Sequence, residues 1–308
     1  MSMRKWDKKM TSRNCPVCET AASSAKLFLE KNIDSEKLSK FSFASRKLPE
    51  YMSHHLVQCP KCDLVYADSP PSQSELANAY HVSDFDSTEE AEDAAETYYK
   101  AVYDIIQKNN KKYALEIGTG TGIFLEYLKN NGFDNVIGIE PSSAAIAAAP
   151  PHRRAWIQES IFRESDFEPN TFNFICCFMT LEHVRDPQEI VSAATRLLAP
   201  GGVVAFITHD YRSTINSFLG SKSPIIDIEH MQLFSKKSMY ELLTRNKLKN
   251  ISISSIKNRY TIKYWIRLLP LSNFVKLLLL KILTKTRLGN VKIAINVGNI
   301  ISYASRED

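Results

Sequence analysis

The chain has 308 residues, 44% of them hydrophobic and 24% charged, and it carries a formal net charge of +5. A chain of this length can bury a sizeable core, which predicts one large domain and a smaller one. Ten Lys or Arg residues but only two acids lie in residues 257–308, a net charge of +8, so the rest of the chain carries −3. This distribution argues against nucleic acid as a partner of the main domain and leaves open an anionic surface or substrate near the tail.

Residues 1–10 are charged and have no apolar stretch of signal-peptide length, and no segment has the uninterrupted apolar length of a membrane span. We therefore expect a cytoplasmic protein without a transmembrane segment. Six cysteines in a chain this long do not make a disulfide framework, and their placement indicates a metal site instead.

Two Cys-x-x-Cys pairs, Cys15 with Cys18 and Cys59 with Cys62, are separated by 40 residues. Four thiolates complete a tetrahedral zinc site and leave no open position for chemistry. We therefore predict a structural Zn²⁺ that stabilises a small zinc-binding domain over residues 1–70.

Residues 71–112 are predicted to be a helical connector. Its stretch 84–96 has seven acids and no base, which indicates a solvated segment rather than a binding patch. A helix is expected to start near Ser87. Tyr80, at the hinge before it, is expected to be ordinary packing, with a reach into the ligand cleft as the alternative. The apolar stripe of that helix consists of Tyr98, Val102, Ile105 and Ile106.

A strand, a glycine turn and a helix are predicted from residue 113 onward. Residues 113–117 form a short apolar run, and Gly118, Gly120 and Gly122 follow at alternate positions before apolar residues at helical spacing begin at Ile123. Glycine is needed because a side chain would keep a ligand away from the backbone, and because the turn uses dihedral angles open only to glycine. The dinucleotide fingerprint has its third glycine at the position of Ile123, so the spacing argues against hydride transfer.

The pattern Glu-x-Gly-x-Gly-x-Gly that starts at Glu116 resembles motif I of the class I S-adenosylmethionine (SAM) methyltransferases. The resemblance implies a Rossmann-like α/β fold with a seven-stranded sheet over residues 113–308, after a small zinc-ribbon-like N-terminal domain. It also implies that Glu116 contacts the methionine part of SAM. The cofactor-binding residues implied in the turn are Gly118, Thr119, Gly120 and Gly122.

An acid at the end of the next predicted strand fits the same family. Glu140 ends residues 136–140 and lies 24 residues after Glu116. In the family, a carboxylate at this place accepts hydrogen bonds from both ribose hydroxyls of SAM. The further cofactor-binding residues that the resemblance implies are Pro141, directly after Glu140, and Ser160 and Ile161, beyond a third strand at 155–158.

The fourth and fifth strands are predicted at 172–179 and 203–208. Residues 172–179 are a continuous apolar run, as expected for a strand buried on both faces. The resemblance places the end of this strand, with Met179, beside the methyl donor. The phrase Leu-Glu-His-Val at 181–184, followed by Asp-Pro, is a hallmark of the family. The residues expected to cap the helices after these strands are Ser142, Asp186 and Ser235.

Three histidines follow the ends of predicted strands and are the candidate catalytic residues. They are His183 after the fourth strand, His209 after the fifth, and His230 in a segment that resembles the one returning over the acceptor pocket. Histidine suits the removal of a hydroxyl proton near neutral pH. Among the three, His183 is the first candidate for the general base, because its strand end is expected to lie beside the donor methyl group.

The run 58–66 and the residues after it look like the N-terminal zinc-binding domain found ahead of many sugar-modifying and polysaccharide-cluster methyltransferases. This resemblance implies a saccharide or nucleotide-sugar hydroxyl as the acceptor. The chain is shorter than the sugar C-methyltransferases, which favours O-methylation over C-methylation.

The tail is expected to supply a sixth strand at 251–256 and an antiparallel seventh at 299–304. Between them, a basic amphipathic segment near 264–285 contains Arg267, Lys276 and Lys281 among apolar clusters. It is predicted either to pack against the domain or a dimer partner, or to make a peripheral contact with a membrane or lipid-linked acceptor. The first alternative is favoured.

Two other functions stay open. The first is an RNA methyltransferase with a zinc recognition module, against which the mildly acidic body and the lack of an Asn-Pro-Pro-Tyr-like motif after the fourth strand argue. The second is a SAM-binding module without catalysis, against which the intact Glu116, Glu140 and glycines argue. The residues do not decide between O-, C- and N-methylation, nor do they give the oligomeric state.

Overall fold

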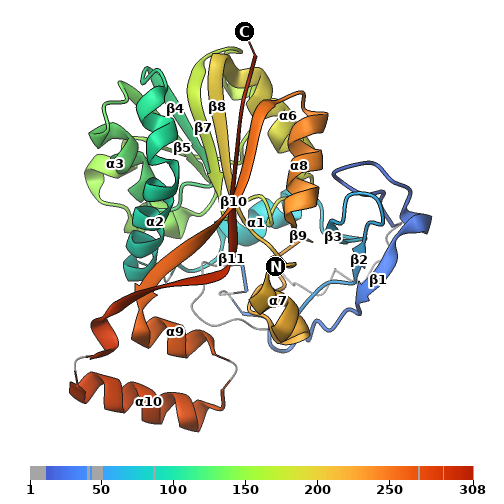
Figure 1. Cartoon of the computed structure of the whole chain (residues 1–308), viewed down its shortest axis with the longest axis vertical. Helices are drawn as coiled ribbons and strands as arrows, with labels where there is room; N and C mark the ends of the chain where they lie inside the picture. The colour runs from blue at the N-terminus through green and yellow to red at the C-terminus, as the bar shows by residue number, and fades with distance from the viewer. Residues whose placement is uncertain are drawn as a thin grey trace.

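The computed structural model describes residues 12–39, 42–43, 51–85, 88–269, 271–286 and 288–307. Seven strands form its central sheet (Figure 1). They are β4 (Tyr113–Ile117), β5 (Asn135–Glu140), β6 (Ile157–Glu159), β7 (Phe172–Phe178), β8 (Leu198–His209), β10 (Lys249–Thr261) and β11 (Lys292–Ser305). Across the sheet the order is β10-β11-β8-β7-β4-β5-β6. Strands β4 to β8 pair in parallel, and β11 lies antiparallel between β8 and β10. The predicted Rossmann-like seven-stranded sheet is confirmed.

Helices cover both faces of this sheet. The α-helices are α1 (Gln73–His81), α2 (Thr88–Lys108), α3 (Ile123–Asn130), α4 (Ser143–Ala148), α5 (Pro151–Arg154), α6 (Pro187–Leu197), α7 (Thr214–Leu219), α8 (Lys236–Arg245), α9 (Ile262–Leu268) and α10 (Asn273–Thr286). The short 3₁₀ helices are η2 (Ala22–Ser24), η3 (Glu164–Asp166), η4 (Gly220–Lys222) and η5 (Leu288–Asn290). In the described part of the chain, no helix has both the length and the apolar character needed to cross a membrane.

The apolar run of β7 is buried on both faces, as predicted. Phe174, Cys176 and Phe178 pack in the core formed with α2 and α3, whereas Ile175 and Cys177 pack in the core formed with α6 and α8. Successive side chains of a strand point to opposite faces, so a strand covered by helices on both sides must be apolar throughout.

The predicted helix caps are confirmed. The Ser142 and Ser235 hydroxyls accept hydrogen bonds from the N–H groups three residues later, and the Asp186 carboxylate accepts from the N–H groups of Gln188 and Glu189. These caps satisfy N–H groups that have no partner inside the helix. They fix where α4, α6 and α8 begin.

The third strand and the tail differ from the prediction. Strand β6 begins two residues later than expected, because a short helix, α5, lies between α4 and the strand. Pro151 is the first residue of α5, a position where the backbone N–H has no partner inside the helix and its absence costs nothing. Strands β10 and β11 extend past the predicted 251–256 and 299–304, and they form a hairpin that carries α9 and α10 beyond the sheet. The basic segment near 264–285 is therefore two helices rather than one.

The sequence had indicated that the acids of residues 84–96 form a solvated segment, but three of them, all in α2, form ion pairs. Glu90, Asp93 and Glu96 lie 3.6, 2.5 and 3.6 Å from Arg267, Lys292 and Arg259. The acidic connector therefore pairs with the base of the basic hairpin. Charges that are far apart in the sequence largely neutralise each other there.

A second, four-stranded sheet has the order β1 (Lys26–Leu29), β2 (Leu56–Gln58), β3 (Val65–Ala67) and β9 (Gln232–Leu233). Its fourth strand comes from the segment after β8, and Leu233 pairs with Val65. The cysteine pairs also belong to the same apolar core cluster as Leu115 and Ile175 of the large sheet. The boundary predicted at residue 70 stays a prediction, but the two parts share a core.

Because of this shared core, we expect the chain to unfold in a single cooperative transition. Leu233 is 1% exposed, so Leu233→Ala is expected to lower the free energy of unfolding by about 2–5 kcal/mol. The matched control, Leu27→Ala on the exposed side of β1, should change it by less than about 0.5 kcal/mol. Urea unfolding followed by fluorescence and circular dichroism measures both. An early, separate transition of the N-terminal part would contradict the expectation.

Candidate active site

The glycine turn after β4 brings the backbone close to its neighbours. Gly118 has a φ of +77°, and a Cβ there would lie 2.2 Å from the Thr180 hydroxyl oxygen. Gly120 has a φ of +55°, and a Cβ there would meet only open space. Gly118 is therefore required by packing, whereas Gly120 leaves its side of the turn open to a ligand.

Two buried carboxyl groups flank this turn. Glu116 accepts a hydrogen bond from the Thr119 hydroxyl, and Glu140 accepts from the N–H groups of Gly120 and Ser142, both at 2.8 Å. Burial raises the pKa of Glu116 to about 8, with the nearby charge of Glu140 adding to the effect, and burial also raises the pKa of Glu140. Both carboxyl groups lie at the ends of adjacent parallel strands, where ligands bind in open α/β sheets.

A cavity of about 960 Å³ opens in front of this edge of the sheet. Its volume is at the upper end of the range of about 300–1,000 Å³ that small-molecule sites occupy. The predicted cofactor residues that line it are Glu116, Gly118, Thr119, Gly120, Glu140, Pro141, Ile161 and Met179. Gly122 and Ser160 do not line it. Gly122 precedes α3 and faces Ile157, and the Ser160 N–H donates to the Glu140 carbonyl oxygen. Met179 has a φ of +51°, a strained conformation of the kind that collects at functional sites.

The three predicted histidines come together in the lining of the same cavity. The ring centroid of His230 lies 4.9 Å from that of His183 and 5.3 Å from that of His209. They come from three separate loops, after β7, at the end of β8 and before β9. The cavity therefore joins the two carboxyl groups and the histidines in one space.

Hydrogen bonds orient two of these rings. The His230 Nδ1–H donates to the Ile225 carbonyl at 2.8 Å. The His209 Nδ1–H donates at 2.8 Å to the amide oxygen of Asn299, whose own NH₂ donates to Asn258. Burial lowers the pKa of His209 to about 4, so its ring is neutral at pH 7.

His183 has a partner that the sequence did not indicate. Its Nδ1 lies 3.0 Å from the Tyr80 hydroxyl and 3.3 Å from the Glu229 carbonyl oxygen. Tyr80 therefore lines the cavity, and its ring also packs edge-on against Phe43. His183, Glu229 and His230 also offer ligand atoms within 4.8 Å of one another, so this corner could hold a metal ion.

Hydrogen bonds of Glu182 connect the three histidine loops. Its carboxylate accepts from the His209 N–H at 2.7 Å, and its carbonyl oxygen accepts from the N–H groups of Met231 and Gln232. Burial raises the pKa of Glu182 to about 7. The Gln232 side chain in turn donates to the carbonyl oxygens of Leu181 and Val184.

Sequence reasoning missed several residues that line the cavity. Asn258 and Asn299 lie in no motif, and only the hydrogen bonds that join them to each other and to His209 identify them. Tyr80 and Glu229 lie in segments that the sequence had singled out, but their contacts with His183 were not predicted. Tyr98 of α2 and Trp265 of α9 also line the cavity. The apolar stripe of α2 was a signal for Tyr98, but periodicity cannot separate a core position from a cavity wall.

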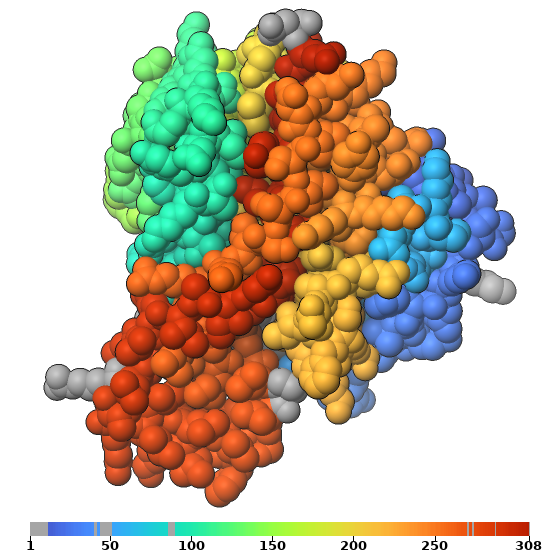
Figure 2. All heavy atoms as spheres, viewed as in Figure 1, coloured from blue at the N-terminus to red at the C-terminus, as the bar shows by residue number. Residues whose placement is uncertain are grey.

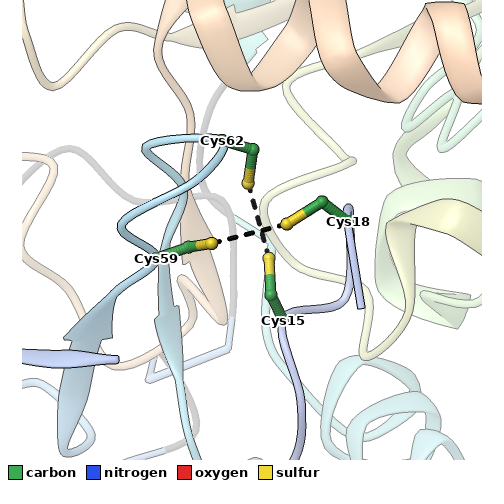
Figure 3. A group of neighbouring side chains, drawn as sticks. All are labelled: Cys15, Cys18, Cys59 and Cys62. Atoms are coloured by element: carbon green, nitrogen blue, oxygen red, sulfur yellow. Dashed lines mark hydrogen bonds between the residues drawn. The ribbon is translucent and has the colours of Figure 1, made fainter. Parts of the chain in front are cut away.

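The four predicted zinc ligands converge on one point (Figure 3). Cys15 and Cys62 have their sulfur atoms 3.5 Å apart, Cys18 and Cys59 have theirs 3.4 Å apart, and all four lie within 4.8 Å of one another. Four thiolates at about 2.3 Å from a common zinc ion would be separated by less than 4 Å, so this donor set fits Zn²⁺.

The second cysteine knuckle contacts the loop that follows β8. Asp63, next to Cys62, forms a two-point salt bridge with Arg212 at 2.6 and 3.0 Å, and its carbonyl oxygen accepts from the Tyr211 hydroxyl. His209 lies only two residues before Tyr211. The knuckle therefore holds the chain directly beside the histidines.

The order of the seven strands, the glycine turn and the two carboxyl groups define the class I SAM-dependent methyltransferases. The chain belongs to the methyltransferase domain family, whose pattern matches residues 90–253, more than half of the sequence. The prediction of a SAM-dependent methyltransferase is confirmed at this level.

Its curated relatives include ubiquinone biosynthesis O-methyltransferases. The protein of Methylococcus capsulatus is 39% identical over 101 residues, 31% of this chain and 42% of that protein. The protein of Aliivibrio fischeri is 23% identical over 158 residues, 47% of this chain and 67% of that protein. The match to the Methylococcus protein thus spans about two fifths of its length.

Solved structures with a similar fold share little sequence with this chain. A SAM-dependent methyltransferase from Archaeoglobus fulgidus is 14% identical, with a TM-score of 0.48 over 69% of this chain and 94% of that one. The YcgJ protein of Bacillus subtilis is 12% identical, with a TM-score of 0.49 over 68% and 99%. This likeness concerns the fold alone.

The raised pKa of Glu116 predicts how stability depends on pH. Its folded-state pKa of about 8 exceeds the unfolded value of about 4.3, so the folded protein binds more protons between these values. The free energy of unfolding should fall as the pH rises through this window, by up to about 1.4 kcal/mol per pH unit for one proton. Glu182 adds to this slope below about pH 7.

Urea unfolding between pH 5 and pH 9 measures the slope. Glu116→Gln should flatten it above pH 7, whereas Glu159→Gln, at an exposed carboxylate on β6, should leave it unchanged. The same slope in Glu116→Gln and in the wild type would contradict the assignment.

Proposed function

We propose that this protein transfers the methyl group of SAM to a hydroxyl group of a small molecule. One observation carries the proposal: a single cavity joins Glu116, Glu140 and the open side of Gly120 to the three histidines. The names of the curated relatives, which are O-methyltransferases, support an oxygen acceptor. The resemblance of the N-terminal segment to that of sugar-modifying methyltransferases supports a saccharide or nucleotide-sugar hydroxyl.

The residues around the glycine turn fit SAM. The Glu140 carboxylate is held by two backbone N–H groups in an orientation suited to the ribose hydroxyls, and Glu116 accepts hydrogen bonds at the methionine end. When bound, SAM supplies a methyl group on a positively charged sulfur, which a nucleophile can attack in line. Burial raises the pKa of both carboxyl groups. A nearby positive charge would lower their pKa again and favour the ionised forms.

His183 is the proposed general base. It follows the end of β7 close to Met179, and Tyr80 and Glu229 hold its ring. It accepts the hydroxyl proton while the oxygen forms its bond to the methyl carbon and the sulfur–carbon bond breaks. His209, with a pKa of about 4, is a weaker base and is assigned to binding the acceptor, as is His230. The surrounding apolar walls exclude water and orient the two reactants.

The test is methyl transfer from labelled SAM to a fractionated cell extract, with mass spectrometry of the methylated product. His183→Gln should lower kcat by about 10²–10⁴-fold, the usual contribution of a general base. Its SAM affinity, measured by calorimetry, should stay within about threefold because the carboxyl edge is untouched. His152→Gln, at a histidine of α5 outside the cavity lining, is the control and should keep full activity.

Three results would decide against the proposal. Full activity in His183→Gln would remove its role as base. Transfer to RNA instead of small molecules would favour an RNA methyltransferase. SAM binding without any methylated product in any extract fraction would favour a binding module.

We also propose a structural Zn²⁺ held by Cys15, Cys18, Cys59 and Cys62. Cys59→Ser/Cys62→Ser should reduce the zinc content from about one ion per chain to none and lower the midpoint of thermal unfolding. Methyl transfer should fall as well, because Asp63 beside Cys62 holds Arg212 and Tyr211. Elemental analysis and calorimetry measure these effects, and Cys176→Ala, at a buried thiol of β7, should keep the zinc. Wild-type protein that folds normally without zinc would contradict the proposal.

A further inference from the structure

Helix α10 presents a large apolar surface to solvent. Phe274, Leu277 and Leu278 are 78%, 68% and 50% exposed, and Ile282 is half exposed on the same face of the helix. None of the side chains that the structure describes on α10 is fully buried. An exposed apolar face of this kind marks an interaction site.

The same helix is basic. It carries Lys276, Lys281 and Lys285 and no acid, and residues 257–306 contain no acid at all. The Lys276 ammonium donates to the Arg267 carbonyl, and no ion pair joins Lys281 or Lys285 to an acid among the residues described. The acids of α2 instead pair with Arg259, Arg267 and Lys292 at the base of the hairpin. The positive charge of α10 is thus left facing solvent.

The α9–α10 lobe, defined as α9, α10 and η5, projects beyond the sheet (Figure 2). Helix α9 packs against α10, and its residues Trp265 and Leu268, with Leu269 directly after it, line the cavity. Leu269 is itself 46% exposed, and Phe218 of α7, another lining residue, is 87% exposed. Exposed apolar side chains therefore also lie at the rim of the active-site cavity.

We propose that the α9–α10 lobe docks on the surface of an anionic phospholipid bilayer. Helix α10 has 14 residues and is about 21 Å long, too short to cross the hydrocarbon core but suited to lie in the interface. Its apolar side chains enter the acyl region while Lys281 and Lys285 contact lipid phosphates. Cationic and apolar groups on one short helix match this partner better than they match a protein surface.

A second copy of the chain fits this face less well. In a two-fold dimer the same patch meets itself, so the lysines of both copies would come together with no acid of the lobe to oppose them. Like charges at such an interface cost free energy, whereas an anionic bilayer is attracted to them. Charge complementarity therefore selects the bilayer.

The docking brings the rim of the cavity to the lipid. An acceptor with an apolar part could then enter past Leu269 and Phe218 without crossing water. This last step rests on the proposed methyl transfer, but the binding of the lobe to lipid does not.

The test is co-sedimentation of the full-length protein with vesicles of phosphatidylcholine alone or mixed with phosphatidylglycerol. Binding is expected only to the mixed vesicles and should weaken as salt is added. Leu277→Ser/Leu278→Ser should weaken binding about a hundredfold, roughly tenfold for each leucine. Lys281→Gln/Lys285→Gln should weaken it about fivefold for each charge removed. Leu27→Ser, at an exposed leucine of β1, is the matched control and should bind like the wild type.

Calorimetric SAM binding by each variant separates this test from that of the proposed function, since the lobe variants should bind SAM like the wild type. Absence of binding of the wild type to phosphatidylglycerol vesicles would overturn the proposal. Equal binding by Leu277→Ser/Leu278→Ser would do so too. A dimer in sedimentation velocity that these substitutions dissociate, without vesicle binding, would assign the face to a second copy instead.

Discussion

The candidate site depends on the hydrogen bonds of one buried residue, Glu182. Its carboxylate and its carbonyl oxygen bind the backbone of the two other histidine loops, at His209 and at Met231–Gln232. A buried carboxyl group without partners would be costly, so these bonds are strongly favoured once the sheet has formed. They fix His183, the next residue, against His209 and His230. The neighbouring Gln232 strengthens the arrangement by bonding both sides of the His183 loop.

The same loops also connect the two parts of the protein. Gln232 and Leu233 form β9, the fourth strand of the N-terminal sheet, and Arg212 pairs with Asp63 of the second cysteine knuckle. The N-terminal part is therefore built against the loops that carry the histidines. These contacts would give the proposed zinc site a physical role, because a rigid knuckle restricts the loop that carries His209.

The cations of the tail fall into two groups with different surroundings. The acids of α2 neutralise Arg259, Arg267 and Lys292 at the base of the long hairpin, which anchors α9 over the cavity. The lysines of α10 have no such neighbours among the described acids. The tail thus has one set of cations that stabilises the fold and another that faces outward.

The sequence by itself determined strands β4, β5 and β7 of the large sheet, the glycine turn and the two carboxyl groups, because each of them is marked by a pattern of neighbouring residues. The apolar run of β7 and the spacing of Gly118, Gly120 and Gly122 are local patterns that have one structural solution. The convergence of the four cysteines was predictable for a similar reason, since each Cys-x-x-Cys pair is a local pattern.

Only the tertiary structure decided which residues surround the histidines and what the tail does. The hydrogen bonds between Tyr80 and His183, between His209 and Asn299 and between Asn299 and Asn258 span 103, 90 and 41 residues of the chain, and no local pattern marks a hydrogen bond across such separations. The place of the basic segment on the β10–β11 hairpin follows from how far the two long strands extend beyond the sheet. Pairing between distant strands sets that length, and periodicity within the segment carries no information about it.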